Sequence, residues 1–182
     1  GLSMGDHQAI TALEWGIARE AQDELAATSH QKMAKAYEDG FFDDLITPFL
    51  GLERDNNLRP DSTVEKLAKL KPAFGKGDGR TMTAGNSTPL TDGASCVLLA
   101  SEEWAKANGH EILAYLSFQE TAAVDFIGKK EGLLMAPAYA VPHMLERAGI
   151  KLQDFDYYEI HEAYASQVLS TLKAWEDTAF CK

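Results

Sequence analysis

The 182-residue sequence predicts an α/β fold, and two observations support this prediction. The part after about residue 94 alternates short apolar runs, which are typical of buried strands, with segments whose apolar residues recur at helical spacing. The part before about residue 76 has only the helical spacing and many charged residues. Strands that alternate with helices favour a sheet covered by helices. We therefore expect a helical first part followed by an α/β part.

The composition excludes several classes of protein. Hydrophobic residues make up 45% of the chain and charged residues 25%, which is the balance of a soluble globular protein. No apolar run approaches the ~20 residues that a membrane-spanning helix needs. The formal net charge of −11 disfavours nucleic acid as a partner, because an acidic surface repels a phosphate backbone.

The first residues and the cysteines indicate the setting of the chain. Residues 1–6 (GLSMGD) have neither the basic nor the apolar region of a signal peptide, and we expect a chain entered midway. Cys96 and Cys181 lack metal-type spacing, and the low cysteine count suits a reducing cytoplasm, which is the expected location. Cys96 lies in an apolar run and is interpreted as a buried packing thiol. The histidines share no common spacing, so no metal site is expected.

The first part of the chain carries clear helix signals. A first helix is expected to begin near Asp6, which could cap it. A second helix should cover residues 19–37, with Gly40 at the position of a C-terminal cap. Residues 62–65 have capping-box spacing, which predicts a short helix that runs to Leu70 and ends before Pro72.

The second part carries the predicted strands. Strands are expected over residues 94–100, 112–118 and 155–160, and helices over residues 102–108, 138–148 and 165–175. Apolar runs of this kind need a cover on both faces. We therefore expect the chain either to belong to a longer protein or to associate with copies of itself.

Two segments could carry chemistry. His161 directly follows the third predicted strand, where a helix is expected to begin, and an imidazole there could hold a water against a developing oxyanion. A histidine that only satisfies the helix end is the simpler interpretation. The loop of residues 83–93 is rich in small and polar residues and could contact a pantetheine arm or a phosphate, or could simply lead into a strand. No P-loop or G-x-G-x-x-G motif is present.

Several segments, taken in order, resemble the thiolase family. Residues 4–5 (MG), 19–24 (REAQDE), 29–32 (SHQK) and 41–48 (FFDDLITP) resemble the loop domain that covers the family's active site. Residues 70–74 (LKPAF) resemble the exit from this domain, and residues 83–94 resemble the return into the N-terminal half. Residues 160–165 (IHEAYA) resemble the family's N-E-A-F or H-E-A-F segment. The resemblance is collinear over essentially the whole chain.

The resemblance implies a fold and an activity. The fold would be a piece of the layered α/β thiolase fold, with a mainly helical loop domain over residues 1–78, the end of the N-terminal half over residues 79–109 and the start of the C-terminal half over residues 110–182. The intact protein would be an acyl-CoA acyltransferase that acts through an acylated cysteine, by thiolysis of 3-ketoacyl-CoA or Claisen condensation of acetyl-CoA. Coenzyme A thioesters would be its substrates, and no cofactor is implied.

The resemblance also assigns candidate site residues. His161 stands at the position whose Asn or His holds a water in the family's oxyanion hole. A histidine there is more similar to the degradative long-chain enzymes, including the β subunit of trifunctional fatty-acid oxidation complexes, than to the short-chain biosynthetic ones. The remaining candidates are Ser3, Lys71 and Thr88 near CoA, and Leu133 and Tyr164 near the acyl or pantetheine end.

Departures from the family pattern limit what the chain is expected to do alone. The family's nucleophilic cysteine, G-H-P histidine and C-x-G base have no counterpart in the sequence, and neither Cys96 nor Cys181 matches them. The chain alone is therefore expected to be inactive. Lys71 stands where arginine is usual, which keeps the charge but loses bidentate phosphate binding. Ala18 stands where a capping serine is usual.

Partners and alternative functions follow from the same comparison. A homo-oligomer is expected, and a hydratase–dehydrogenase subunit is a further candidate partner. The main alternative function is a non-catalytic module that recognises CoA or contacts another subunit. A small α/β hydrolase, which would need a reactive serine, is a weaker alternative.

Overall fold

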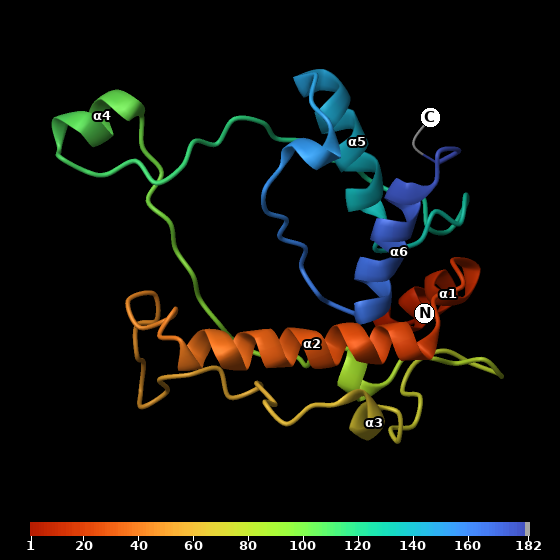
Figure 1. Cartoon of the computed structure of the whole chain (residues 1–182). Helices are drawn as coiled ribbons and strands as arrows, with labels where there is room; N and C mark the ends of the chain where they lie inside the picture. The colour runs from red at the N-terminus through yellow and green to blue at the C-terminus, as the bar shows by residue number, and fades with distance from the viewer. Residues whose placement is uncertain (181–182) are drawn as a thin grey trace.

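The computed structural model describes residues 1–180, which form a group of packed helices with long extended connections (Figure 1). The helices are α1 (Met4–Glu14), α2 (Arg19–Glu38), α3 (Val64–Leu67), α4 (Glu102–Ala107), α5 (Ala136–Ala148) and α6 (Ala165–Glu176), and two 3-10 turns are η1 (Ala84–Asn86) and η2 (Leu152–Asp154). None of the described helices is long and apolar enough to cross a membrane.

Helix α1 begins after Ser3, so the prediction that Asp6 caps it was wrong. The Ser3 hydroxyl accepts a hydrogen bond from the Asp6 N–H at 3.1 Å, and the Asp6 carboxylate accepts one from the Ser3 N–H at 3.2 Å. This reciprocal capping box leaves Asp6 as the third helical residue. A carboxylate in the first turn also interacts favourably with the helix dipole.

Helices α2 and α3 follow the predicted pattern with one change. Helix α2 covers the expected residues, Ala18 provides no side-chain cap, and Gly40 follows the last turn with a φ of +75° that glycine adopts readily. Helix α3 is shorter than expected and does not reach Leu70. Its cap is Thr63, whose hydroxyl accepts a hydrogen bond from the Lys66 N–H at 3.3 Å.

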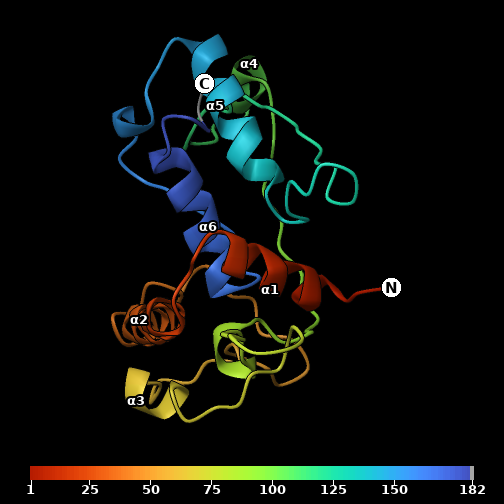
Figure 2. The ribbon, with the colours of Figure 1, turned by 90° about the vertical axis from the view of Figure 1, so that its right-hand side faces the viewer.

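Helix α6 is the centre of the packing, because α1, α2 and α5 all contact it (Figure 2). Near its start, Tyr164 joins a buried cluster with Ala9 and Ala12 of α1. Near its end, Ala174 is fully buried against Met135 and Ala138 at the start of α5. The helices expected over residues 102–108, 138–148 and 165–175 are confirmed as α4, α5 and α6.

The three predicted strands are not strands in this chain. Within residues 1–180 the only β-type pairings are isolated bridges, at Phe49–Leu52, Pro72–Thr83 and Ser87–Tyr164. Residues 94–100, 112–118 and 155–160 are extended but unpaired, and Figure 1 shows the first two leading to and from α4, apart from the other helices. The prediction failed because a strand forms only beside a hydrogen-bonding neighbour, and the described chain offers these segments none.

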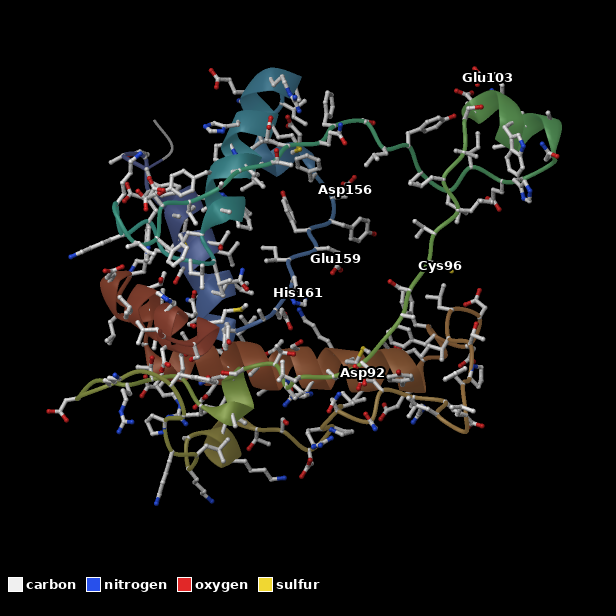
Figure 3. The ribbon with its side chains drawn as sticks, turned by 180° about the vertical axis from the view of Figure 1, so that it is seen from behind. Asp92, Cys96, Glu103, Asp156, Glu159 and His161 are labelled. Carbon is white, nitrogen blue, oxygen red and sulfur yellow. The ribbon has the colours of Figure 1, made fainter. Side chains whose placement is uncertain are left out.

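The apolar side chains of these segments are consequently exposed. Val97, Leu98 and Leu99 are 82%, 71% and 75% exposed, and Leu113 and Leu116 are 88% and 80% exposed. Cys96 directly precedes Val97 on the same exposed segment, so the prediction of a buried packing thiol is also wrong for this chain (Figure 3). Cys181 lies outside the described residues.

The capping box of α1 predicts an acid-sensitive contribution to stability. The Ser3 hydroxyl, followed by the N–H of Gly75, holds the pKa of the Asp6 carboxyl below its ordinary value of 3.8. A carboxyl with a lowered pKa stabilises the fold above its unfolded pKa, and this contribution is lost as the pH falls through the folded pKa. We expect the thermal midpoint of the wild-type chain to fall more steeply below about pH 4 than that of Asp6→Asn.

The Ser3→Ala variant provides the matched comparison. It removes the largest cause of the lowered pKa of Asp6 but keeps the carboxylate and the Gly75 N–H, which lies 3.0 Å from it. Its loss of stability on acidification should be intermediate. Carboxylates titrate over roughly pH 5 to pH 2. If the Asp6→Asn chain loses as much stability as the wild type over this range, the proposed contribution of the Asp6 carboxylate is contradicted.

Candidate functional site

A cleft of about 620 Å³ lies between α2, the loop that follows it, and the loop of residues 83–89. Its walls are partly apolar and partly polar. The lining includes Leu25, Ser29, His30 and Met33 of α2, Leu58 and Arg59 of the connecting loop, residues 84–89, and Glu162 and Ala165 at the entry to α6. The loop of residues 83–93, a candidate from sequence, therefore lines the cleft with its first half.

The first half of this loop is held in one conformation by its own side chains. The Thr83 hydroxyl accepts a hydrogen bond from the Gly85 N–H at 3.2 Å, and the Asn86 carbonyl oxygen accepts one from the Thr83 N–H at 2.8 Å. Gly85 lies against α3, and a Cβ at this position would come within 2.5 Å of Leu70 and 2.6 Å of Leu67. The close backbone approach that the glycine indicated is therefore made to these leucines.

The loop lies side by side with the segment that enters α6. Ser87 and Tyr164 form an antiparallel bridge, and the Thr88 N–H donates a hydrogen bond to the Ala163 carbonyl at 2.9 Å. Two of the candidate residues, Thr88 and Tyr164, are thus brought together although 76 positions separate them in the sequence. One wall of the cleft is built from both segments.

His161 lies close to this wall, on the segment that leads into α6. Helix α6 begins at Ala165, as predicted, with Tyr164 as its cap, so the imidazole is carried by the extended segment before the helix. Ala163 and Tyr164 of this segment pair with the loop before the helix starts. Figure 3 shows His161 on this segment, over α2. The side chain is exposed, and the cleft is lined by its neighbour Glu162.

Glu162 connects the His161 segment to α2. Its carboxylate accepts a hydrogen bond from the Ser29 hydroxyl at 2.5 Å. Both residues line the cleft. Sequence reasoning treated Glu162 only as part of a motif and Ser29 only as part of a resemblance, because neither residue type signals a contact across 133 positions.

Tyr164 is the best-buried candidate, with 9% of its surface exposed. Its ring packs edge-on against Phe74, with 5.8 Å between the ring centroids. Burial raises the pKa of the Tyr164 phenol above its ordinary value of 10.0, and the nearby Asp6 carboxylate adds to the shift. The phenol therefore stays protonated and uncharged at neutral pH.

The other candidate residues lie away from the cleft. Ser3 is occupied in capping α1, and Lys71 is exposed beyond the end of α3. Leu133 is half-buried, and its neighbour Leu134 packs on the cluster formed by α1 and Tyr164. Ser3, Lys71 and Leu133 are thus not among the described residues that line the cleft.

Arg59 is a cleft residue that sequence reasoning missed. Its guanidinium donates hydrogen bonds to the backbone carbonyls of Asn56 and Leu58, at 2.8 and 2.9 Å. The backbone N–H of Arg59 donates to His30 Nδ1 at 3.3 Å. An arginine fixed at the edge of a cleft is well suited to bind a phosphate. It carries no motif, so only its position in space identifies it.

The comparisons with known proteins identify the family. The family profile described as "Thiolase, N-terminal domain" matches residues 1–103, and "Thiolase, C-terminal domain" matches residues 110–179. Together they cover most of the chain. The chain therefore belongs to the thiolase family, as the resemblance in the sequence implied.

Curated relatives and solved structures agree with this assignment. Proteins named 3-ketoacyl-CoA thiolase from Pseudoalteromonas translucida and Pectobacterium carotovorum are 46% and 44% identical over 100% of this chain and 42% of their own length. The acetyl-CoA acetyltransferase of Bacillus anthracis is 39% identical, with a TM-score of 0.86 over 96% of this chain and 45% of that one. The dimeric peroxisomal thiolase of Saccharomyces cerevisiae is 35% identical, with a TM-score of 0.80 over 94% of this chain and 43% of that one.

The extent of these matches sets the scale of the chain. It spans about two fifths of the length of the curated relatives it matches. The high TM-scores mean that residues 1–180 adopt a part of the thiolase fold, and that this part is mainly helical.

Proposed function

We propose that the protein to which these residues belong is an acyl-CoA acyltransferase that cleaves 3-ketoacyl-CoA with CoA or performs the reverse condensation of acetyl-CoA. Membership of the thiolase family and the names of its relatives support this activity. The observation that carries the proposal is the cleft, because its wall joins the loop of residues 83–89 to the segment of His161.

The cleft has the properties that a CoA thioester requires. Its volume of about 620 Å³ falls within the range of ordinary ligand sites. Leu25, Met33 and Leu58 offer apolar surface to a pantetheine arm, and Arg59 offers a cation to a phosphate. The local cation matters because the chain as a whole carries a net charge of −11. We propose no cofactor other than the CoA thioesters themselves.

The proposed reaction proceeds through an acylated cysteine. The cysteine thiolate adds to the 3-keto carbon, the bond between carbons 2 and 3 breaks, and acetyl-CoA leaves after protonation of its carbanion. The CoA thiol then attacks the acyl-cysteine and releases the shortened acyl-CoA. His161 would hold a water that donates a hydrogen bond to the developing oxyanion. On the resemblance, the cysteine and its proton-transfer partners belong to family segments that residues 1–182 do not match.

We propose that Thr88, which lines the cleft, and Tyr164, which is bridged to the cleft loop, contact the CoA or pantetheine part of the substrate. Ser3, Lys71 and Leu133 lie away from the cleft, and on the resemblance alone we propose that they reach the substrate only at its edges. A cytoplasmic location, a homo-oligomer and a hydratase–dehydrogenase partner complete the proposal.

A second candidate function is a module that contacts another subunit without chemistry of its own. The exposed apolar side chains of residues 97–99 and of Leu113 and Leu116 favour it, because large apolar surfaces on soluble proteins usually mark interfaces. The two functions are compatible in a longer protein, but they differ for the chain by itself.

The chain alone should not transfer acyl groups. Residues 1–182 supplied with acetoacetyl-CoA and CoA should form no acetyl-CoA above the uncatalysed rate, because the acylated cysteine of the family has no counterpart in them. Separation of the CoA thioesters by liquid chromatography measures the product. Turnover in this assay would contradict the proposed division of roles, and Cys96→Ser would then show whether the exposed thiol of Cys96 had served as the nucleophile.

Binding of CoA should depend on Arg59. We expect calorimetry to show that Arg59→Ala weakens the binding of CoA about tenfold, which is the order expected for loss of a charge-assisted hydrogen bond. Lys71→Ala should weaken it less, because Lys71 lies outside the cleft. Arg54→Ala is the matched control, since this guanidinium lies over the ring of Tyr37, 4.7 Å from its centroid.

Pantetheine distinguishes the phosphate contact from a general loss of structure. It lacks phosphate, so its affinity should be equal for the wild-type chain and Arg59→Ala. Equal affinity of the two chains for CoA, or a larger effect of Lys71→Ala, would contradict the assignment of Arg59.

A further inference from the structure

The carboxylate of Asp23, on α2, is buried, with 1% of the residue exposed. Its two oxygens have different partners. Arg19 Nε donates to Oδ2 at 2.7 Å, and Asn86 Nδ2 donates to Oδ1 at 2.9 Å. Burying a charge is costly unless it is paired and hydrogen-bonded, and here both conditions are met.

Arg19 extends the network to the end of α3. Its Nη2 donates to the backbone carbonyls of Leu67 and Leu70, at 2.7 and 3.1 Å. Among the ion pairs of the described residues, Arg19–Asp23 is the one with both side chains largely buried, at 18% and 1% exposed. The Lys35–Asp39 pair on the same helix, by contrast, is 70% and 56% exposed.

Asn86 extends the network into the cleft loop. A carboxylate can only accept hydrogen bonds, so Asp23 fixes which end of the Asn86 amide faces it. The amide nitrogen must point to Asp23, which leaves the carbonyl oxygen to accept the Thr83 N–H at 2.8 Å. The same nitrogen lies 3.3 Å from the carbonyl oxygen of Thr81. The buried carboxylate of Asp23 is therefore hydrogen-bonded to the residue whose side chain also holds the start of the loop of residues 83–88.

The loop then transmits this constraint to the wall of the cleft. Ser87 is bridged to Tyr164, and the Thr88 N–H is bonded to Ala163. Asp23 itself does not line the cleft, whereas Asn86, Ser87 and Thr88 do. The hydrogen bonds of Asn86 to Asp23 and of Thr88 to Ala163, joined by the backbone of residues 86–88, thus connect α2 to the segment that carries His161.

We propose that Asp23 is a positioning residue for CoA recognition: through Asn86 it holds the loop of residues 83–88 in the conformation that forms one wall of the cleft, without touching the ligand. This inference rests on the proposed function for the identity of the ligand. It does not rest on it for the role of the network, which is a property of the free chain. A buried ion pair contributes little net stability compared with an apolar pair, but removal of Asp23 alone would leave the Arg19 guanidinium without its partner, so stability is measured beside the loop conformation.

Exchanging the two side chains tests the proposal. Asp23→Asn keeps a single acceptor oxygen, which can accept from Arg19 or from Asn86 but not from both, and Asn86→Asp places a carboxylate beside that of Asp23, so each single variant loses a hydrogen bond of the network. In the double variant, the amide at position 23 can again donate to the carboxylate at position 86, which can still accept the Thr83 N–H. The control is Asp39→Asn, the same chemical change on the exposed face of α2.

Two quantities are measured for each variant. Hydrogen exchange of the Thr83 amide, resolved by NMR, reports the loop without any ligand, and calorimetry reports the affinity for CoA. We expect each single variant to accelerate Thr83 exchange and to weaken CoA binding by about tenfold. The double variant should restore both to within about threefold of the wild type, and Asp39→Asn should change neither.

A purely structural role would give a different result. Asp23→Asn would then raise exchange throughout α1, α2 and α6 as much as at Thr83, and the double variant would lose as much as the two single changes together. That outcome, or unchanged Thr83 exchange in Asp23→Asn, would overturn the proposal. If the wild-type chain binds no CoA, the proposed function fails for this chain, while the Thr83 exchange and its restoration still decide the role of Asp23.

Discussion

The packing of α6 against α1, α2 and α5 is the constraint on which the rest of the structure depends. Small residues allow it, because Ala165 and Ala174 let the neighbouring backbones approach both ends of the helix. With α6 in this position, its cap Tyr164 lies against Phe74 and is bridged to Ser87 of the loop of residues 83–88. Helix packing therefore positions one side of the cleft wall. The other side is the loop of residues 83–88, whose Asn86 is hydrogen-bonded to Asp23.

Burial is divided unevenly over the chain. Most of the buried residues among those described lie in α1, α2 and α6, including the polar Gln8 and Asp23, and the polar Asn86 is buried in η1. The extended segments on either side of α4 hold large exposed apolar side chains, such as Leu98 and Leu116. This contrast agrees with the family comparisons, because the chain spans about two fifths of the length of the relatives it matches. A surface of this kind is expected to be covered by other parts of a protein or by a partner.

Signals in the local sequence predicted the helices well, whereas features that depend on contacts between distant residues, such as strand pairing, could not be predicted. Helix α2 was predicted almost to the residue, because its apolar spacing and Gly40 are readable without knowledge of the fold. The strands failed because an apolar run such as residues 94–100 indicates where a strand can form, but pairing depends on a neighbour that sequence cannot supply. Ser3 was missed as the cap of α1 because both Ser3 and Asp6 are good capping residues, and only their reciprocal hydrogen bonds decide between them.

The site divides in the same way. The resemblance identified the loop of residues 83–93 and the segment of His161, and the bridge between Ser87 and Tyr164 joins them. It did not identify Arg59 or Asp23. Arg19 and Asp23 are four residues apart on a helix, which usually indicates an exposed ion pair, and nothing in the sequence reveals that this pair is buried under Asn86.

We propose that CoA binds in the cleft between α2 and the loop of residues 83–89. Hydrogen exchange of the whole chain with and without CoA, followed by mass spectrometry of its peptides, locates the bound ligand. CoA should slow exchange in peptides covering residues 83–89 and 162–165 and should leave those of α5, which does not line the cleft, unchanged. Slower exchange confined to α4 or α5, with residues 83–89 unaffected, would contradict it.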